Sequence, residues 1–326
     1  MQYYLTTLGH NSEVPLWLHH TVFDHFAPTA QESALCESSA VFVVIQCQDS
    51  FRFDPEIFRA VEQSKLPIVI FDYSEGCLAA AEYERLKTAL ASANVVGWFL
   101  RDYKVSDHFT GCPVWPLEFT TRRFTAYDKP EPLEVYKRRP IDLLLMWGYS
   151  SIDRVRLHGA LMTQFSRFRA GTAPAQTLED AEWAISHDGC SMALIYTPHY
   201  RRMPLDKMMW LQSQAKITIS LFGNGMKCFR STEAGYNSVG AHQAPESLLW
   251  AYPWIDQHNC IALPNLAGTR SLDIDAAVEA LYYWSVVDHG ALYTLYEHSH
   301  ENNQKYVADV YARDYILPKI REVCAS

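Results

Sequence analysis

The chain has 326 residues, of which 48% are apolar and 20% charged, and it holds 9 Trp, 19 Tyr and 15 Phe. This composition excludes an intrinsically disordered chain, and the length favours two domains of about 150 residues each. The net charge of −9 argues against a general binder of nucleic acid or anionic membranes. No run reaches the roughly 20 apolar residues of a membrane span, and the first residues carry no leader pattern, so we expect a cytoplasmic protein.

The first half of the chain alternates short apolar runs with helical patterns. The predicted strands cover residues 40–47, 66–73, 95–103 and 112–119, and the predicted helices cover 54–65 and 79–93. Continuous β-branched runs such as AVFVVIQC are typical of strands that are covered on both faces. The alternation predicts a parallel sheet with helical crossovers.

The same alternation returns after a segment rich in proline and charge. Predicted strands cover 141–147, 191–197, 216–222 and 259–264, and predicted helices cover 153–166, 205–214 and 275–287, with one or two more over 293–323. We therefore predict an α/β fold of two Rossmann-like domains facing a cleft, with C-terminal helices. The predicted divisions are 1–124, a linker at 125–139, and 140–326 with terminal helices that cross back.

The segment 220–243, SLFGNGMKCFRSTEAGYNSVGAHQ, holds the densest set of candidate residues. A strand ends near Phe222, a glycine-rich turn follows, and a helix begins near Lys227 or Phe229. Backbone N–H groups at a helix start favour anions, and Lys227 and Arg230 add two positive charges there. Glu233 lies one turn beyond Arg230 and is placed to accept hydrogen bonds from ribose hydroxyls. The alternative is an ordinary turn in which Arg230 and Glu233 pair with each other.

This segment resembles the C-terminal domain of GT-B glycosyltransferases. K-C-F-R-S-T-E-A is similar to the R-x-x-E-A helix start of the exostosin-like and family-1/4-like sets, and R-P-I-D-L-L-L-M-W-G-Y resembles the opening of such a domain. The likeness covers residues 139–265, and over 1–130 it is topological only. The first acid of the E-x-F-G-x-x-x-x-E loop is absent, so only Glu233 matches an acidic residue of that motif.

The resemblance implies a nucleotide-sugar donor, UDP- or GDP-linked, bound mainly by the C-terminal domain, with no other cofactor and no metal. Lys227 and Arg230 would hold the diphosphate and Glu233 the ribose. The other donor-binding candidates lie after predicted strands or in the first turn of a helix: Gly148, Tyr149, Ser150, Arg154, Tyr200, Gly223, Asn224 and Gly225. For Arg154 a solvent-exposed side chain is the alternative, and for Tyr200 a solvated basic loop.

Transfer to a hydroxyl acceptor needs either assistance by the donor phosphate or a general base, which we expect at the end of a strand in the N-terminal domain. Asp72 and Glu75, which follow the run PIVIF, are the best placed, and Asp49 and His10 come next. Each also fits a helix cap or turn. Asp273-Ile274-Asp275 matches a D-x-D metal string, but its position before a strong helix favours an N-cap.

The acceptor class stays open among glycans, lipids, proteins and a hydroxymethylated DNA base. A DNA acceptor would need a basic face, and the only local basic cluster is Arg122, Arg123, Lys129, Lys137, Arg138 and Arg139. Two rival hypotheses are a non-catalytic nucleotide- or sugar-binding protein of the same fold, favoured by the incomplete acidic loop, and a scaffolding α/β protein. Fold resemblance alone does not separate these.

Overall fold

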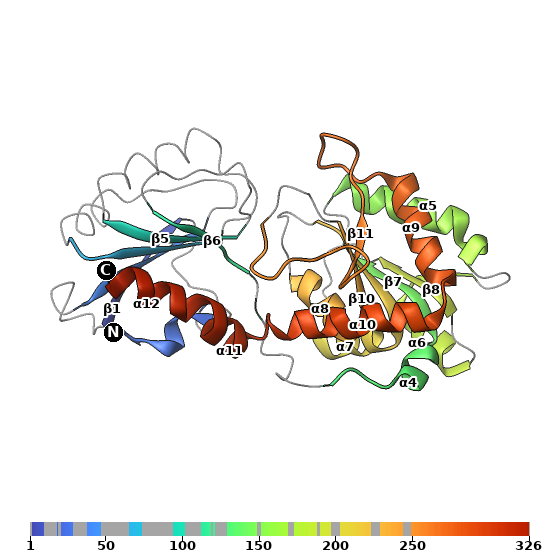
Figure 1. The fold of residues 1–326 in the computed structure, drawn as a ribbon. Helices are drawn as coiled ribbons and strands as arrows, with labels where there is room; N and C mark the ends of the chain where they lie inside the picture. The colour runs from blue at the N-terminus through green and yellow to red at the C-terminus, as the bar shows by residue number, and fades with distance from the viewer. Residues whose placement is uncertain are drawn as a thin grey trace.

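A computed structural model describes the two sheets of the molecule and most of the C-terminal half (Figure 1). The described residues are 2–9, 18, 21–28, 38–46, 65–73, 94–101, 112–118, 120, 129–148, 151–168, 173–187, 190–196, 203–222, 229–243 and 249–325. The predicted helices over 54–65 and 79–93 lie outside them. None of the described helices is long and apolar enough to cross a membrane.

The first sheet is built from the N-terminal third of the chain, and each strand pair recorded within it is parallel. Its strands are β1 (Gln2–Gly9), β2 (Ala27–Pro28), β3 (Ala40–Gln46), β4 (Ile68–Asp72), β5 (Val95–Leu100) and β6 (Val114–Pro116). Their order is β2-β1-β3-β4-β5-β6. Every residue of β4 is buried, as expected for a strand covered on both faces.

The second sheet is also parallel, in the order β11-β10-β9-β7-β8. Its strands are β7 (Ile141–Trp147), β8 (Cys190–Tyr196), β9 (Ala215–Ser220), β10 (Val239–Gln243) and β11 (Ile261–Leu263). Parallel neighbours require crossovers, which here are α5 (Ile152–Phe168) with α6 (Leu178–His187), α7 (Leu205–Ser213) and α8 (Phe229–Asn237). The predicted α/β fold with two parallel sheets is confirmed.

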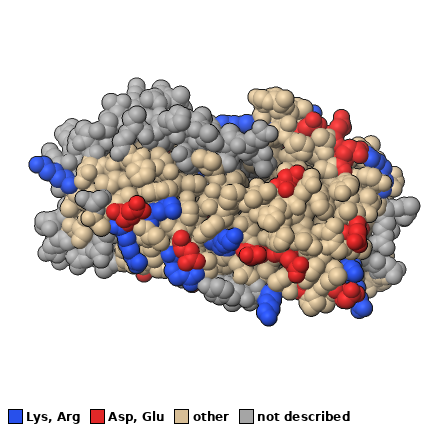
Figure 2. Space-filling model, viewed as in Figure 1, with Lys and Arg blue, Asp and Glu red and all other residues tan. Residues whose placement is uncertain are grey.

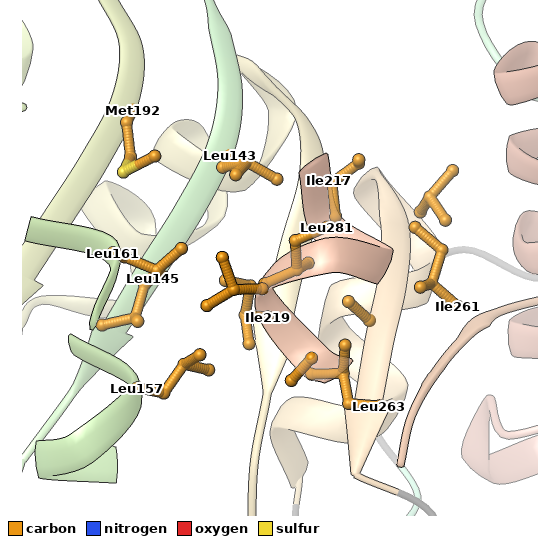
Figure 3. Packing of buried hydrophobic residues seen from close by; sticks show 14 of the residues in the cluster. Leu143, Leu145, Leu157, Leu161, Met192, Ile217, Ile219, Ile261, Leu263 and Leu281 are labelled. Atoms are coloured by element: carbon orange, nitrogen blue, oxygen red, sulfur yellow. The ribbon is translucent and has the colours of Figure 1, made fainter. Parts of the chain in front are cut away.

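The side chains of β7 from Leu143 to Trp147 alternate between the two faces of the second sheet, and both faces are buried. Leu143 and Leu145 face a cluster that includes Ile219, Leu157 and Leu161 of α5, and α9 (Ile274–Val286) adds Leu281 (Figure 3). Leu144 and Met146 face the opposite cluster, which α6 and α7 cover. Side chains that alternate between two buried faces explain why this strand reads as one continuous apolar run.

The C-terminal helices belong to both halves of the molecule. They are α10 (His289–Gln304), α11 (Ala308–Tyr311), a π-helical turn over Ala312–Ile316, and α12 (Leu317–Ala325). The helix α10 packs on α8, whereas Tyr311, Ile316 and Ile320 lie in the core of the first sheet. Figure 1 shows this path, in which the red helices run from the second sheet back to the first.

Hydrogen bonds join the halves where the chain crosses. The Tyr311 hydroxyl donates to the carbonyl of Pro116 at 3.0 Å, and burial raises its pKa well above the usual value for tyrosine. The N–H of Ala251 donates to Oε1 of Glu118 at 2.8 Å. Glu118 follows β6 and Ala251 belongs to the segment after β10, so this bond links segments that leave the carboxyl ends of the two sheets.

Part of the predicted linker is packed against the second sheet. A five-residue helix, α4 (Leu133–Lys137), carries the fully buried Tyr136, whose hydroxyl donates to the carbonyl of Lys216 at 2.9 Å. Arg139 is also buried, bound to Glu131 and to the carbonyls of Ala215 and Asn237. The many charges of this segment therefore include a buried ion pair. The proposed division at 125–139 stays a prediction.

Candidate functional site

Two of the predicted donor residues, Gly148 and Arg154, lie at the carboxyl edge of the second sheet. Because β7, β9 and β10 are parallel, Gly148, Leu221 and Gln243 mark the same edge. Helix α5 starts four residues after Gly148, and α8 starts eight residues after Leu221. Two helix N-termini therefore follow strand ends at this edge, the arrangement that favours anions.

Arg154 is buried, so the solvent-exposed alternative for this residue is wrong. Its Nη2 donates to the carbonyl of Leu221 at 2.9 Å, and its Nη1 lies 3.3 Å from the carbonyl of Gly148. The guanidinium carbon also lies 5.6 Å from the centre of the Trp147 ring. Arg154 thus places a positive charge between the ends of β7 and β9 and ties those two ends together.

A second polar group at this edge was not predicted from the sequence. The side chain of Gln243 reaches Asn265, Arg270 and Asp153, and its Oε1 lies 3.4 Å from the N–H of Phe222. Asp153 in turn accepts from the N–H of Leu272 at 2.9 Å. In the sequence, an acidic residue such as Asp153 in the first turn of a helix is interpreted as a cap. Its bond to Leu272, which is distant in the sequence, leaves no local pattern that would predict it.

Glu233 is buried on α8, in a run of buried residues from Ser231 to Tyr236. Ser231 Oγ lies 3.4 Å from Ser220 Oγ, which sets the first turn of α8 against the end of β9. The predicted helix start near Phe229 is confirmed. Contact of Glu233 with a ribose stays a prediction.

Gly235 and Gly240 each lie close to another side chain of the protein. A Cβ on Gly235 would collide with Asn303 and lie 2.8 Å from Ser299 Oγ, both on α10. A Cβ on Gly240 would collide with the ring of His242. A protein side chain therefore lies against the backbone at both positions.

Asp72 ends β4 at the carboxyl edge of the first sheet and is buried. Its carbonyl accepts from the N–H of Arg101 at 2.9 Å, and Arg101 Nη1 lies 3.3 Å from the carbonyl of Tyr73. Arg101 is buried as well, and it follows Leu100, the residue of β5 that pairs with Asp72 in the sheet. A role for Asp72 as the base stays a prediction.

Many of the predicted residues lie outside the described part of the chain. They are Glu75, Tyr149, Ser150, Tyr200, Gly223, Asn224, Gly225 and Lys227, the second-rank bases Asp49 and His10, and the side chain of Arg230. The structure brings together Gly148, Arg154 and the helix that carries Glu233. It leaves the other donor contacts as predictions.

The D-x-D string is a helix cap, as predicted. The Asp273 side chain accepts from the N–H of Ala276 at 3.1 Å and begins α9. Within the described ranges, no group of three or more His, Cys, Asp and Glu side chains is arranged to hold a metal ion.

The fold is similar to solved glycosyltransferase structures. One is the GtfA/B complex, at 11% identity and a TM-score of 0.53, where the match covers 88% of this chain and 58% of the other. Another is described as trehalose-6-phosphate from E. coli bound with UDP-2-fluoro glucose. It has 10% identity and a TM-score of 0.50, and the match covers 98% of this chain and 92% of the other. Both have the GT-B fold of two Rossmann-like domains, which confirms the predicted fold class.

Neither sequence comparison gives a match: no model of a known protein family fits the chain, and no curated protein resembles it. The chain spans 58% of the length of the GtfA/B chain. At identities of 10–11% the structural likeness shows the fold, and the exostosin-like subtype stays a prediction.

Proposed function

We propose that the chain is a glycosyltransferase that moves a sugar from a UDP- or GDP-linked donor to a hydroxyl acceptor without a metal. The observation that carries the proposal is the carboxyl edge of the second sheet, where buried Arg154 and the helix of Arg230 and Glu233 meet in a GT-B fold. A cytoplasmic location is part of the proposal.

In the proposed reaction the acceptor oxygen attacks the anomeric carbon, and the bond from that carbon to the diphosphate oxygen breaks. The diphosphate leaves with the electron pair, and Lys227, Arg230 and the helix N-terminal N–H groups stabilise its charge. Asp72 or Glu75 takes the proton of the acceptor hydroxyl. The other role of the protein is to hold donor and acceptor in line.

We infer that a DNA acceptor is the weakest of the open acceptor classes. Arg139 is buried in its ion pair with Glu131, and Lys137 pairs with Glu134 at 3.3 Å, so both are already engaged. On the described atoms of the face shown in Figure 2, basic and acidic side chains are interspersed. A groove for a duplex needs a continuous basic face, which supports a glycan, lipid or protein acceptor instead.

The second candidate is a nucleotide- or sugar-binding protein that lacks turnover. It is favoured by Gly223-Asn224-Gly225, where the family's acidic loop has no acid. Release of nucleoside diphosphate from a donor sugar in the presence of acceptor would exclude it.

Thermal unfolding with UDP, GDP, ADP, CMP and TDP tests the donor site, on the wild-type chain and on Arg230→Ala. A ligand at about 100 times its Kd stabilises the folded chain by about 2.7 kcal/mol, and one nucleotide should raise Tm in the wild type only. Arg138→Ala is the control because Arg138 is exposed at the end of α4. If no nucleotide raises Tm, the donor site does not exist as proposed.

A further inference from the structure

Gln243 occupies a central place among the loops that leave the carboxyl edge of the second sheet. It is the last residue of β10, between β9 and β11, and only 3% of its surface is exposed. Its Nε2 donates to Asn265 Oδ1 at 2.8 Å and to the carbonyl of Arg270 at 3.0 Å, and its Oε1 faces the N–H of Phe222. One amide therefore holds both the exit of β9 and the loop that follows β11.

That loop is a short hairpin. Asn265 pairs with Leu272 as an antiparallel bridge, and the N–H of Leu266 donates to the carbonyl of Ser271 at 2.8 Å. Gly268 has φ of +70°, a backbone conformation that favours glycine, so the tip is built for a tight turn. Residues 266–270 at the tip are exposed, whereas Leu272 is buried. The base of the hairpin is anchored and its tip projects.

Asp153 holds the other side of the same base. Its Oδ2 accepts from the N–H of Leu272 at 2.9 Å and lies 3.5 Å from Gln243 Nε2. Asp153 is the second residue of α5 and sits directly before Arg154, whose guanidinium binds the ends of β7 and β9. Gln243 and Asp153, here called the clasp, thus connect the start of α5, the exit of β9 and the hairpin.

We propose that Gln243 is a positioning residue for the donor site, an inference that rests on the proposed function. Phe222 is the last described residue before the segment that carries Gly223 and Lys227, and the clasp fixes its N–H. Because the same amide also fixes the hairpin and meets Asp153 at the start of α5, the three segments cannot shift independently. Gln243 acts on the donor through these segments and touches no reacting atom.

The chemistry of the site calls for an amide at this position. An apolar side chain of similar volume would leave the Arg270 carbonyl and Asn265 Oδ1, which lie in a part-buried position, without the donor that Gln243 supplies. A carboxylate would be worse, because its oxygens would face Asp153 and the Arg270 carbonyl, which are both acceptors. The proposal therefore predicts an order of donor affinity of Gln, then Met, then Glu.

The test compares Gln243→Met and Gln243→Glu with the wild type by calorimetric titration of the four nucleoside diphosphates and the one monophosphate named above. Gln243→Met should raise the Kd of the nucleotide that binds the wild type most tightly about tenfold, and Gln243→Glu should raise this Kd further. Gln212→Met is the matched control: Gln212 is fully buried on α7, accepts from Asn237 Nδ2, and should change Kd less than about twofold.

A Kd for Gln243→Met equal to that of the wild type, or a weaker Kd for Met than for Glu, overturns the proposal. If no nucleotide binds the wild type, the proposed function fails, and hydrogen exchange of peptides that contain Phe222 and Leu272 decides the clasp alone. Faster exchange at both in Gln243→Met, with no change in Gln212→Met, supports the coupling of the loops. Unchanged exchange rates overturn it.

Discussion

His242 is a buried imidazole whose environment disfavours its charged form. The ring lies over Gly240, its centre is 4.4 Å from that of Trp254, and desolvation by burial lowers its pKa to about 3. Trp254 stacks in turn on Tyr306, whose hydroxyl donates to the carbonyl of Tyr252 at 2.5 Å. A proton on His242 would therefore place a charge inside the aromatic cluster that adjoins the crossing point.

The depressed pKa of His242 predicts a loss of stability in mild acid. Below pH 6.5 the unfolded chain binds a proton on this residue and the folded chain does not, until the pH approaches about 3. The free energy of unfolding should therefore fall by about 1.4 kcal/mol per pH unit from this residue alone within that window.

Urea unfolding of the wild type and of His242→Phe at pH 7 and pH 5 checks this prediction. The difference in unfolding free energy between the two proteins should shift by about 2 kcal/mol in favour of His242→Phe at pH 5. Equal shifts of both proteins between the two pH values would mean that His242 is protonated in the folded state.

Arg139 illustrates how a charge in a predicted linker becomes structural. Its guanidinium binds Glu131 and two carbonyls and stacks 4.8 Å from the centre of the Tyr136 ring. Arg139→Met should lower the free energy of unfolding by about 3 kcal/mol, because it leaves buried acceptors and Glu131 without their partner. Arg138→Met, one residue earlier and exposed, should change it by less than about 0.5 kcal/mol. Denaturant titration of both variants measures these free energies of unfolding. Equal losses in the two variants would refute the structural role of Arg139.

At the scale of elements, the contact between α8 and α10 depends on the missing side chain at Gly235. Gly235→Ala should destabilise the protein by about 1–3 kcal/mol, because the new methyl group collides with Asn303 and approaches Ser299. Gly159→Ala, in the middle of α5 with no atom within 4 Å of the new Cβ, should stabilise it by about 0.5–1 kcal/mol. The melting temperatures of the two variants should therefore move in opposite directions, and a loss in both would contradict the packing of α10 on α8.

Helices and strands were predictable where the local sequence pattern follows directly from burial or from helix capping. Residues Leu143–Trp147 of β7 form an unbroken apolar run because both faces of the strand are buried. Asp273 caps α9, as its position before an apolar helix indicates. Helix α6 was missed although its start carries a capping box, in which Thr177 and Asp180 bond each other's N–H. That pattern would have revealed it.

The candidate site was less predictable, because its contacts join residues that are far apart in the sequence. Arg154 was identified as a pocket residue, but its partner at Leu221 is 67 residues away. Gln243 and Asp153 are 90 residues apart, and neither belongs to a local motif. Such pairs come together only when the parallel sheet has formed. Composition and local residue spacing therefore do not predict them.

For the molecule as a whole, the last helix should stabilise the first sheet. Ile320 on α12 is fully buried in the core with Phe71 and Phe99. Ile320→Ala should lower the free energy of unfolding by about 2–5 kcal/mol and speed hydrogen exchange in β3, β4 and β5 more than in β7 and β9. Arg321→Ala, exposed on the same helix, is the control and should leave exchange unchanged. Faster exchange confined to the second sheet would contradict this arrangement.

The return of α12 to the first sheet has a consequence for how the protein forms during synthesis. The strands of the first sheet are translated before those of the second sheet, yet Tyr311, Ile316 and Ile320, which complete the core of the first sheet, are translated after the second sheet. All the described strands of the second sheet and the helices that pack on them have been translated once α10 has left the ribosome. The core of the first sheet is therefore completed after the second sheet has been translated, and the apolar face that α12 covers stays uncovered during that time.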